Sequence, residues 1–111
     1  MKDSENIVVL VTTISVEEAQ KIAGLLLSQK KVACVNIIKE AESMFWWRGK
    51  IESARESLML IKSTKSRLDD IVSIVKGIHS YEVPEIIALP IIGGSAEYLD
   101  WMGQETSDMQ R

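Results

Sequence analysis

The feature of the sequence that most constrains the fold is an almost continuous apolar, β-branched run, Ile7–Ile14. Such a run predicts a strand that is buried on both faces, in the interior of a sheet. Ser15 follows with capping-box spacing to Glu18, so we expect a helix to begin there. Lys30 and Lys31 suit the negative end of that helix. Its apolar stripe is Ala19, Ile22, Ala23, Leu26 and Leu27.

The middle of the chain predicts two more strands that form a hairpin. Val32–Ile38 is the first, and it continues at Ser43–Trp47 after a polar interruption. Arg48 and Gly49 supply the turn. Lys50–Ser63 then returns as a long strand.

A second helix, a fourth strand and a short last helix complete the predicted order. Thr64 or Ser66 caps the second helix, whose stripe ends at Ile78. Ile86–Ile92 is the fourth strand, and its Pro90 favours a sheet edge because proline cannot donate to a ladder. A last helix is capped by Ser95. We expect its inward-facing residues to be Tyr98, Leu99, Trp101 and Met102.

The order βαββαβ with an appended helix is the α+β, ferredoxin-like arrangement, with an antiparallel sheet ordered 4-1-3-2. This order puts Ile7–Ile14 inside the sheet and Pro90 at its edge. The 111 residues form one domain, 1–111, in which we expect residues 1–6 and 103–111 to be frayed.

Composition narrows the classes of function. The net charge is −3 and the pI about 5.2, with Lys and Arg scattered, so no nucleic-acid partner is expected. No apolar run approaches the roughly 20 residues that cross a bilayer, and we expect no membrane association. Cys34 is the only cysteine, so no disulfide forms within the chain, and we expect a cytoplasmic location.

Uncovered apolar surface predicts an oligomer. The second strand is the other sheet edge, and residues 32–38 carry no charge or proline to protect it. Trp46 and Trp47 are neighbours in an extended strand, so they point to opposite faces of a hairpin tip that one small subunit cannot cover. Closed symmetric association would bury both.

Several motifs spaced along nearly the whole chain resemble those of the CutA, or divalent-cation-tolerance, family. They are ACVNII (33–38), SMFWWRGKIE (43–52), Glu56, IKST (61–64), HSYEVPEIIALPI (79–91) and YLDW (98–101). Ser80 and Lys39 stand where the family usually has proline, which removes backbone rigidity there. The resemblance implies a tight homotrimer of ferredoxin-like subunits that associates with copper and other divalent metals.

Two side chains are candidate metal ligands, and each has a structural alternative. Cys34 is a soft ligand for copper, but a lone cysteine in an apolar strand is more often a buried, inert thiol. His79 offers one imidazole nitrogen, or it caps the end of the second helix. One Cys and one His cannot complete a closed zinc-type set. We expect no required cofactor, with Cu(II) or another divalent cation as the candidate ligand.

The resemblance also implies a ligand cleft between subunits. Its lining would be Trp47, Glu56, Lys62, Tyr81, Glu85 and Trp101. Glu82, in the same loop, is better interpreted as a solvated charge. Lys62 and Glu56 form an exposed ion pair or, if desolvated, orient an anionic ligand.

No catalytic arrangement is evident in the sequence, so we do not expect an enzyme. The leading hypothesis is a trimeric cytoplasmic protein of divalent-metal, chiefly copper, tolerance that binds metal or a small ligand weakly in intersubunit clefts. The alternative is a signalling module that binds a small anionic metabolite and regulates an unidentified protein partner.

Overall fold

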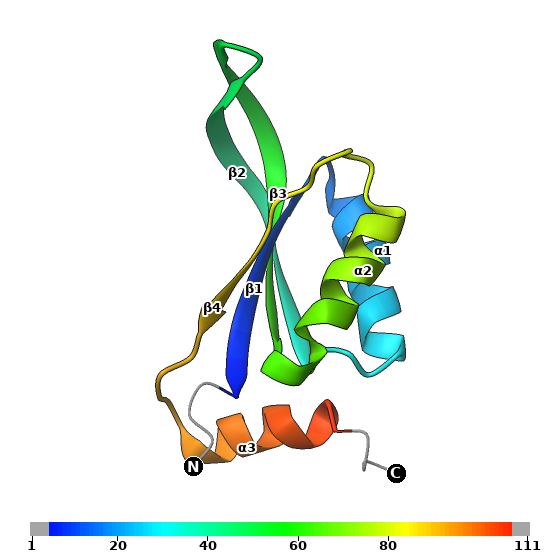
Figure 1. Ribbon diagram of the computed structural model, residues 1–111, viewed down its shortest axis with the longest axis vertical. Coiled ribbons are helices and arrows are strands. Elements are labelled where there is room, and N and C mark those ends of the chain that lie inside the picture. Colours follow the sequence, from blue (N-terminus) through cyan, green and yellow to red (C-terminus); the bar gives the residue numbers. More distant parts are fainter. Residues whose placement is uncertain (1–4, 108–111) are drawn as a thin grey trace.

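A four-stranded antiparallel sheet forms the centre of the molecule (Figure 1). The computed structural model describes residues 5–107. Its elements are β1 (Asn6–Thr13), α1 (Val16–Ser28), β2 (Cys34–Trp47), β3 (Lys50–Thr64), a 3-10 turn (Lys65–Arg67), α2 (Leu68–Ile78), β4 (Ile86–Pro90) and α3 (Ala96–Glu105). The strands pair in the order β2-β3-β1-β4. The predicted βαββαβ order and sheet order are therefore confirmed.

β1 lies inside the sheet, as its apolar run predicts, but only one of its faces is fully buried within one chain, so the expected burial on both faces is not found. Alternate residues of this strand are buried in one core with both long helices, which Figure 1 shows on the same side of the sheet. The largest fully buried members of this core are Val9, Val11, Ile22, Leu26, Met59, Ile61, Ile71 and Val75. The side chains of β1 and β3 that alternate with them point away from α1 and α2.

The other side of the sheet is largely apolar and is only partly covered. Residues that are directly opposite in register share a face, and Leu10 lies between Leu60 of β3 and Ile87 of β4. Ile87 and Leu89 are 50% and 49% exposed. We name this surface the open face and define its apolar part by Val8, Leu10, Leu58, Leu60, Ile87 and Leu89.

β2 and β3 extend past the rest of the sheet as a long hairpin (Figure 1). The predicted break in β2 is wrong, because a bulge between Ile38 and Ala41 absorbs the polar residues without ending the strand. Arg48 (φ 53°) and Gly49 (φ 81°) form the predicted turn, and two left-handed residues match the twist of a two-residue hairpin loop. Trp46, near the tip, is 72% exposed.

Helix ends differ from the sequence prediction in two places. α1 begins at its predicted cap, but it ends at Ser28, before Lys30 and Lys31. These lysines instead form ion pairs with Glu105 and Asp70, at 3.3 and 2.9 Å. Neither predicted hydroxyl caps α2, because the 3-10 turn intervenes and the helix starts without a side-chain cap.

The C-terminal region is more ordered than predicted, and β4 is shorter. α3 continues through residue 105 and Thr106 is buried, so fraying does not begin at residue 103. Of the four α3 residues predicted to face inward, only Met102 is buried; Tyr98 and Trp101 are 43% and 37% exposed. β4 ends at Pro90. At the other end Asn6 already belongs to β1, whereas residues 1–4 and 108–111 lie outside the described residues.

None of the helices within residues 5–107 has the length and apolar character that crossing a bilayer requires.

Candidate functional site

A groove of about 860 Å³ runs along the outer part of the hairpin and the loop that leads into β4. Its acidic lining residues are Glu52, Glu56, Glu82 and Glu85, and its aromatic ones are Phe45, Trp47 and Tyr81. None of the residues that line it is a lysine, arginine or histidine. We name it the acidic groove. Its lining favours a positively charged occupant.

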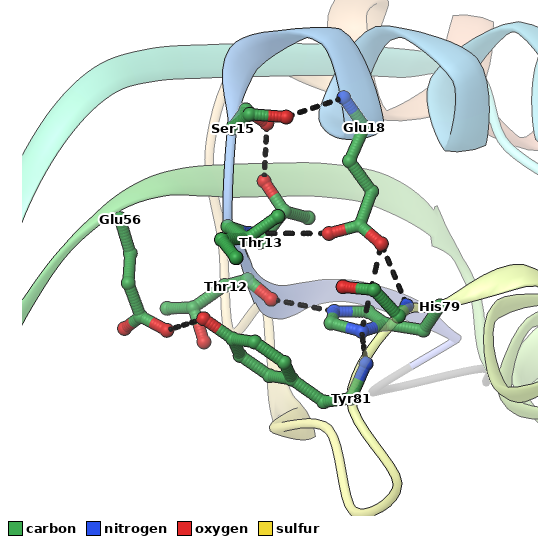
Figure 2. Close-up of polar contacts among 9 residues, drawn as sticks. Thr12, Thr13, Ser15, Glu18, Glu56, His79 and Tyr81 are labelled. Atoms are coloured by element: carbon green, nitrogen blue, oxygen red, sulfur yellow. Dashed lines mark hydrogen bonds and ion pairs between the residues drawn. The ribbon is translucent and has the colours of Figure 1, made fainter.

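Glu56 is the most buried acid of the groove, with 7% of the residue exposed. Its Oε2 accepts a 2.7 Å hydrogen bond from the phenol of Tyr81 (Figure 2). Burial, reinforced by this carboxylate, raises the pKa of Tyr81 to about 12, so the phenol keeps its proton and donates. Among residues 5–107, Oε1 of Glu56 accepts no hydrogen bond and no Lys or Arg pairs with the carboxylate. No described Lys or Arg therefore balances this charge within one subunit, and Oε1 is open to solvent, because no fully shielded side-chain oxygen or nitrogen of the described residues lacks a partner.

His79 fixes the position of the Tyr81 backbone through a hydrogen bond. Its side chain is fully buried, and Nδ1 accepts a 3.0 Å hydrogen bond from the Tyr81 backbone N–H. Nε2 therefore carries the proton and donates to the Thr12 carbonyl oxygen at 2.8 Å (Figure 2). With both nitrogens engaged, a metal could bind His79 only after one of these hydrogen bonds broke. His79 ends α2 only through its backbone N–H, which donates to Val75 O at 2.9 Å; its imidazole contacts no carbonyl of that helix, so the predicted capping by the ring is not found.

Glu18 connects the start of α1 to the same loop. Its backbone N–H donates to Ser15 Oγ, and its carboxylate accepts from the N–H groups of Ile14 (3.1 Å) and Ser80 (2.6 Å). Burial raises the pKa of Glu18, but the hydrogen bonds from Ile14 and Ser80 outweigh it, so the pKa lies below its usual value. Ser80 thus supplies a backbone donor that a proline at this position would lack. This hydrogen bond ties the loop after α2 to the start of α1.

The structure brings four of the six predicted cleft residues together and leaves two apart. Trp47, Glu56, Tyr81 and Glu85 all line the acidic groove. Lys62 lies on the open face six residues along β3 from Glu56, about 20 Å away, and its ammonium donates to Asn36. Trp101 packs on Tyr98, with ring centroids 5.3 Å apart. The predicted alternative of a Lys62–Glu56 ion pair is therefore not formed within one subunit.

The two predicted metal ligands also lie apart. Cys34 is opposite Lys62 in register, while His79 contacts Thr12, farther along the sheet. The thiol is partly buried rather than enclosed, and it adjoins Tyr98, whose pKa is raised by burial and further by Cys34. Within the described part of the chain, no three or more His, Cys, Asp or Glu side chains form a group that could hold a metal ion.

Sequence reasoning missed two acids: Glu52 lines the groove, and Glu18 organises the loop behind it. Glu82 also lines the groove, but it is exposed, as expected of a solvated charge. A signal for Glu52 was present, because it lies four residues from Glu56 on one strand and residues an even number apart share a face. The contact between Glu18 and Ser80 spans 62 residues and has no local signal.

Fold and groove together define a ferredoxin-like α+β domain that carries a ligand-sized, acid-lined groove on its hairpin. Comparison with known proteins makes the assignment specific. Residues 7–105 match the family described as CutA1 divalent ion tolerance protein, and the chain belongs to this family.

Relatives from plants and bacteria support the assignment. The chain is 45% identical over 103 residues to "Protein CutA 1, chloroplastic" of Oryza sativa subsp. japonica, covering 93% of this chain and 58% of that protein. It is 42% identical over 99 residues to "Divalent-cation tolerance protein CutA" of Thermus thermophilus, covering 89% and 96%. The crystal structure of CutA1 from Oryza sativa matches with a TM-score of 0.91 at 43% identity, covering 96% and 97%. This chain therefore spans little more than half of the plant protein's length and nearly all of the bacterial one.

Proposed function

We propose that this protein acts in divalent-cation tolerance, copper included, as a homotrimer whose acidic groove binds a cation weakly at the seam between subunits. Family membership supports the physiological role. The observation that carries the binding role is Glu56, a residue only 7% exposed whose carboxylate pairs with no Lys or Arg of the described residues. A bound cation would supply the missing charge.

Two surfaces support the homotrimer. The open face presents an apolar patch across three strands, and patches of this kind mark association surfaces. β2 is a sheet edge over 14 residues, with Trp46 and Trp47 exposed at its end. Copies related by closed symmetry would cover both surfaces, as the resemblance to the family implies.

The donor set supports weak binding rather than a tight, closed site. The groove offers carboxylate oxygens and one phenol, whereas Cys34 lies elsewhere and both nitrogens of His79 are engaged. Copper is held tightly by imidazole and thiolate donors, so carboxylates alone should hold it loosely. A neighbouring subunit would add the remaining ligands at the seam.

Titration of the assembled protein tests the proposal. We expect saturable binding of Cu(II) and Zn(II) by calorimetry, and a sedimentation mass about three times that of the 12.4 kDa chain. Glu56→Gln should weaken metal binding roughly tenfold or more, since it removes the buried charge. Glu17→Gln is the matched control, because Glu17 is exposed and lies outside the groove. Equal metal affinity of the two variants would contradict the assignment of the groove.

A signalling role with an anionic metabolite and a protein partner is the second candidate. Lys62 on the open face supports it, because a neighbouring copy could bring this cation to a seam. It ranks second because no cationic side chain lines the groove itself. If the protein binds an anion but no metal, and Lys62→Ala abolishes the anion binding, the signalling role becomes the first candidate.

We also propose that the chain binds rather than catalyses, and that it works in the cytoplasm. The only histidine has both nitrogens engaged, which leaves no imidazole free as a general base. A single cysteine requires no oxidising compartment. The plant relative named chloroplastic is longer than this chain, so its location is not transferred. Cell fractionation with an antibody to the protein tests the location.

A further inference from the structure

We propose that the acidic groove is also a binding site for an organic ammonium cation, namely a protonated primary amine carried on an aromatic or apolar body. The inference goes beyond metal tolerance, but it rests on the groove remaining open in the proposed trimer. No part of it requires a metal ion to be bound.

Charge is the first argument. Of the two Glu56 oxygens, Oε2 is taken by the Tyr81 hydroxyl and Oε1 accepts no hydrogen bond from any residue in the described range 5–107 (Figure 2). The residue is more than nine-tenths buried and lines the groove. An ammonium group can donate to this oxygen and supply the missing positive charge at once. Glu52, Glu82 and Glu85 add to the attraction along the same groove.

The apolar walls are the second argument. Phe45, Trp47, Met44 and Val83 line the groove beside Tyr81, and aromatic faces attract organic cations. Trp47 already holds the Arg48 guanidinium 5.4 Å from its ring centroid, so this wall accepts a cation within the chain. A volume of about 860 Å³ suits a small organic molecule. A hydrated metal ion would leave the aromatic walls without a role.

Donor geometry is the third argument. No group of three or more Asp, Glu, His or Cys side chains in the described residues could hold a metal ion, so no three of the groove's carboxylates converge on one point within a subunit. Carboxylates spread along an aromatic groove match a cation whose charge sits at one end of an extended body. The unpartnered oxygen of Glu56, Oε1, would anchor the ammonium, and the aromatic side chains of the groove would cover the body.

Three probes of one shape and different charge test this inference on the full chain: phenethylammonium, the neutral 2-phenylethanol and the anionic 3-phenylpropanoate. Calorimetry should show saturable binding of the ammonium, at least about tenfold tighter than binding of the alcohol, and no binding of the carboxylate. Glu56→Gln keeps an acceptor for Tyr81 and should remove this tenfold preference. Glu17→Gln, outside the groove, should retain it.

Equal affinity for the ammonium and the alcohol would overturn the inference, because the groove would then be only an apolar surface. An ammonium affinity that is the same in Glu56→Gln as in the unmodified protein, or no ammonium binding at all, would also overturn it. A trimer that binds Cu(II) but no ammonium would contradict this inference without contradicting the proposed function. A trimer that binds the ammonium but no metal supports this inference while the proposed function fails.

Discussion

β3 contributes side chains to both sides of the sheet, and the two sides differ in what covers them. Its odd-numbered residues, such as Met59 and Ile61, are fully buried in the core with α1 and α2. The even-numbered Leu58 and Leu60 are equally apolar but lie on the open face and are only partly buried. One chain therefore completes the helix-covered side by itself, whereas it leaves the open face only partly covered, where the proposed trimer would place another copy.

The largest expected effect is on the open face. Leu60→Glu should dissociate the proposed trimer without unfolding the subunit, because each copy would lose about 2 kcal/mol of apolar burial and like charges would meet at the proposed seam at a penalty of several kcal/mol. Sedimentation checks the mass, and circular dichroism checks the fold. Leu27→Glu, an equally drastic change at a 42% exposed site on α1, should remain trimeric. A trimeric Leu60→Glu would show that the open face is not the interface.

Two isoleucines of the same strand sharpen the comparison. Ile61 is fully buried and Ile51, on the hairpin, is 62% exposed. Ile61→Ala should lower the free energy of unfolding by about 2–5 kcal/mol through lost burial and a cavity. Ile51→Ala should change the stability of the subunit by under about 0.5 kcal/mol. Urea unfolding at one fixed protein concentration compares them, and equal losses would mean that the hairpin is buried as deeply as the core.

A smaller effect is expected where the start of α1 contacts the loop between α2 and β4. Glu18→Gln should lower the free energy of unfolding by about 1–2 kcal/mol at neutral pH, because charge-assisted hydrogen bonds to Ile14 and Ser80 weaken. The folded pKa of Glu18 lies below its usual value, so its stabilisation is present above the unfolded pKa of about 4.3 and lost as pH falls through the folded value.

Unfolding curves of the unmodified protein and Glu18→Gln should therefore converge in acid. Glu17→Gln, on the same turn but exposed, should match the unmodified protein at every pH. If the difference in unfolding free energy between the unmodified protein and Glu18→Gln stays constant down to acid pH, the charge of Glu18 is not the source of the stabilisation.

The smallest effect concerns the hairpin turn. Gly49 has φ +81°, a conformation that strains any residue with a Cβ, so Gly49→Ala should lower the free energy of unfolding by about 1 kcal/mol. Gly93→Ala is the control, since Gly93 has neither a positive φ nor a heavy atom within 4 Å of an added Cβ. Thermal unfolding compares them. No difference between the two variants would mean that the turn relaxes without loss.

Local patterns account for what could be predicted. The Ile7–Ile14 run, the Ser15 cap and the Arg48–Gly49 turn each depend on neighbours in the chain, and all three are found. The polar stretch in β2 was misinterpreted because a bulge, unlike a turn, leaves no strong local signature. Tyr98 and Trp101 were expected to face inward, but α3 buries only Met102 of its predicted face.

By itself the sequence determined the order of the elements and the buried stripes of the two long helices, because helical and strand periodicity depend on residues only a few positions apart. Only the tertiary structure decided which polar groups meet. Tyr81 reaches Glu56 across 25 residues, and His79 reaches Thr12 across 67. Such contacts depend on strand register and on the path of the loop after α2, and no short-range pattern encodes either one.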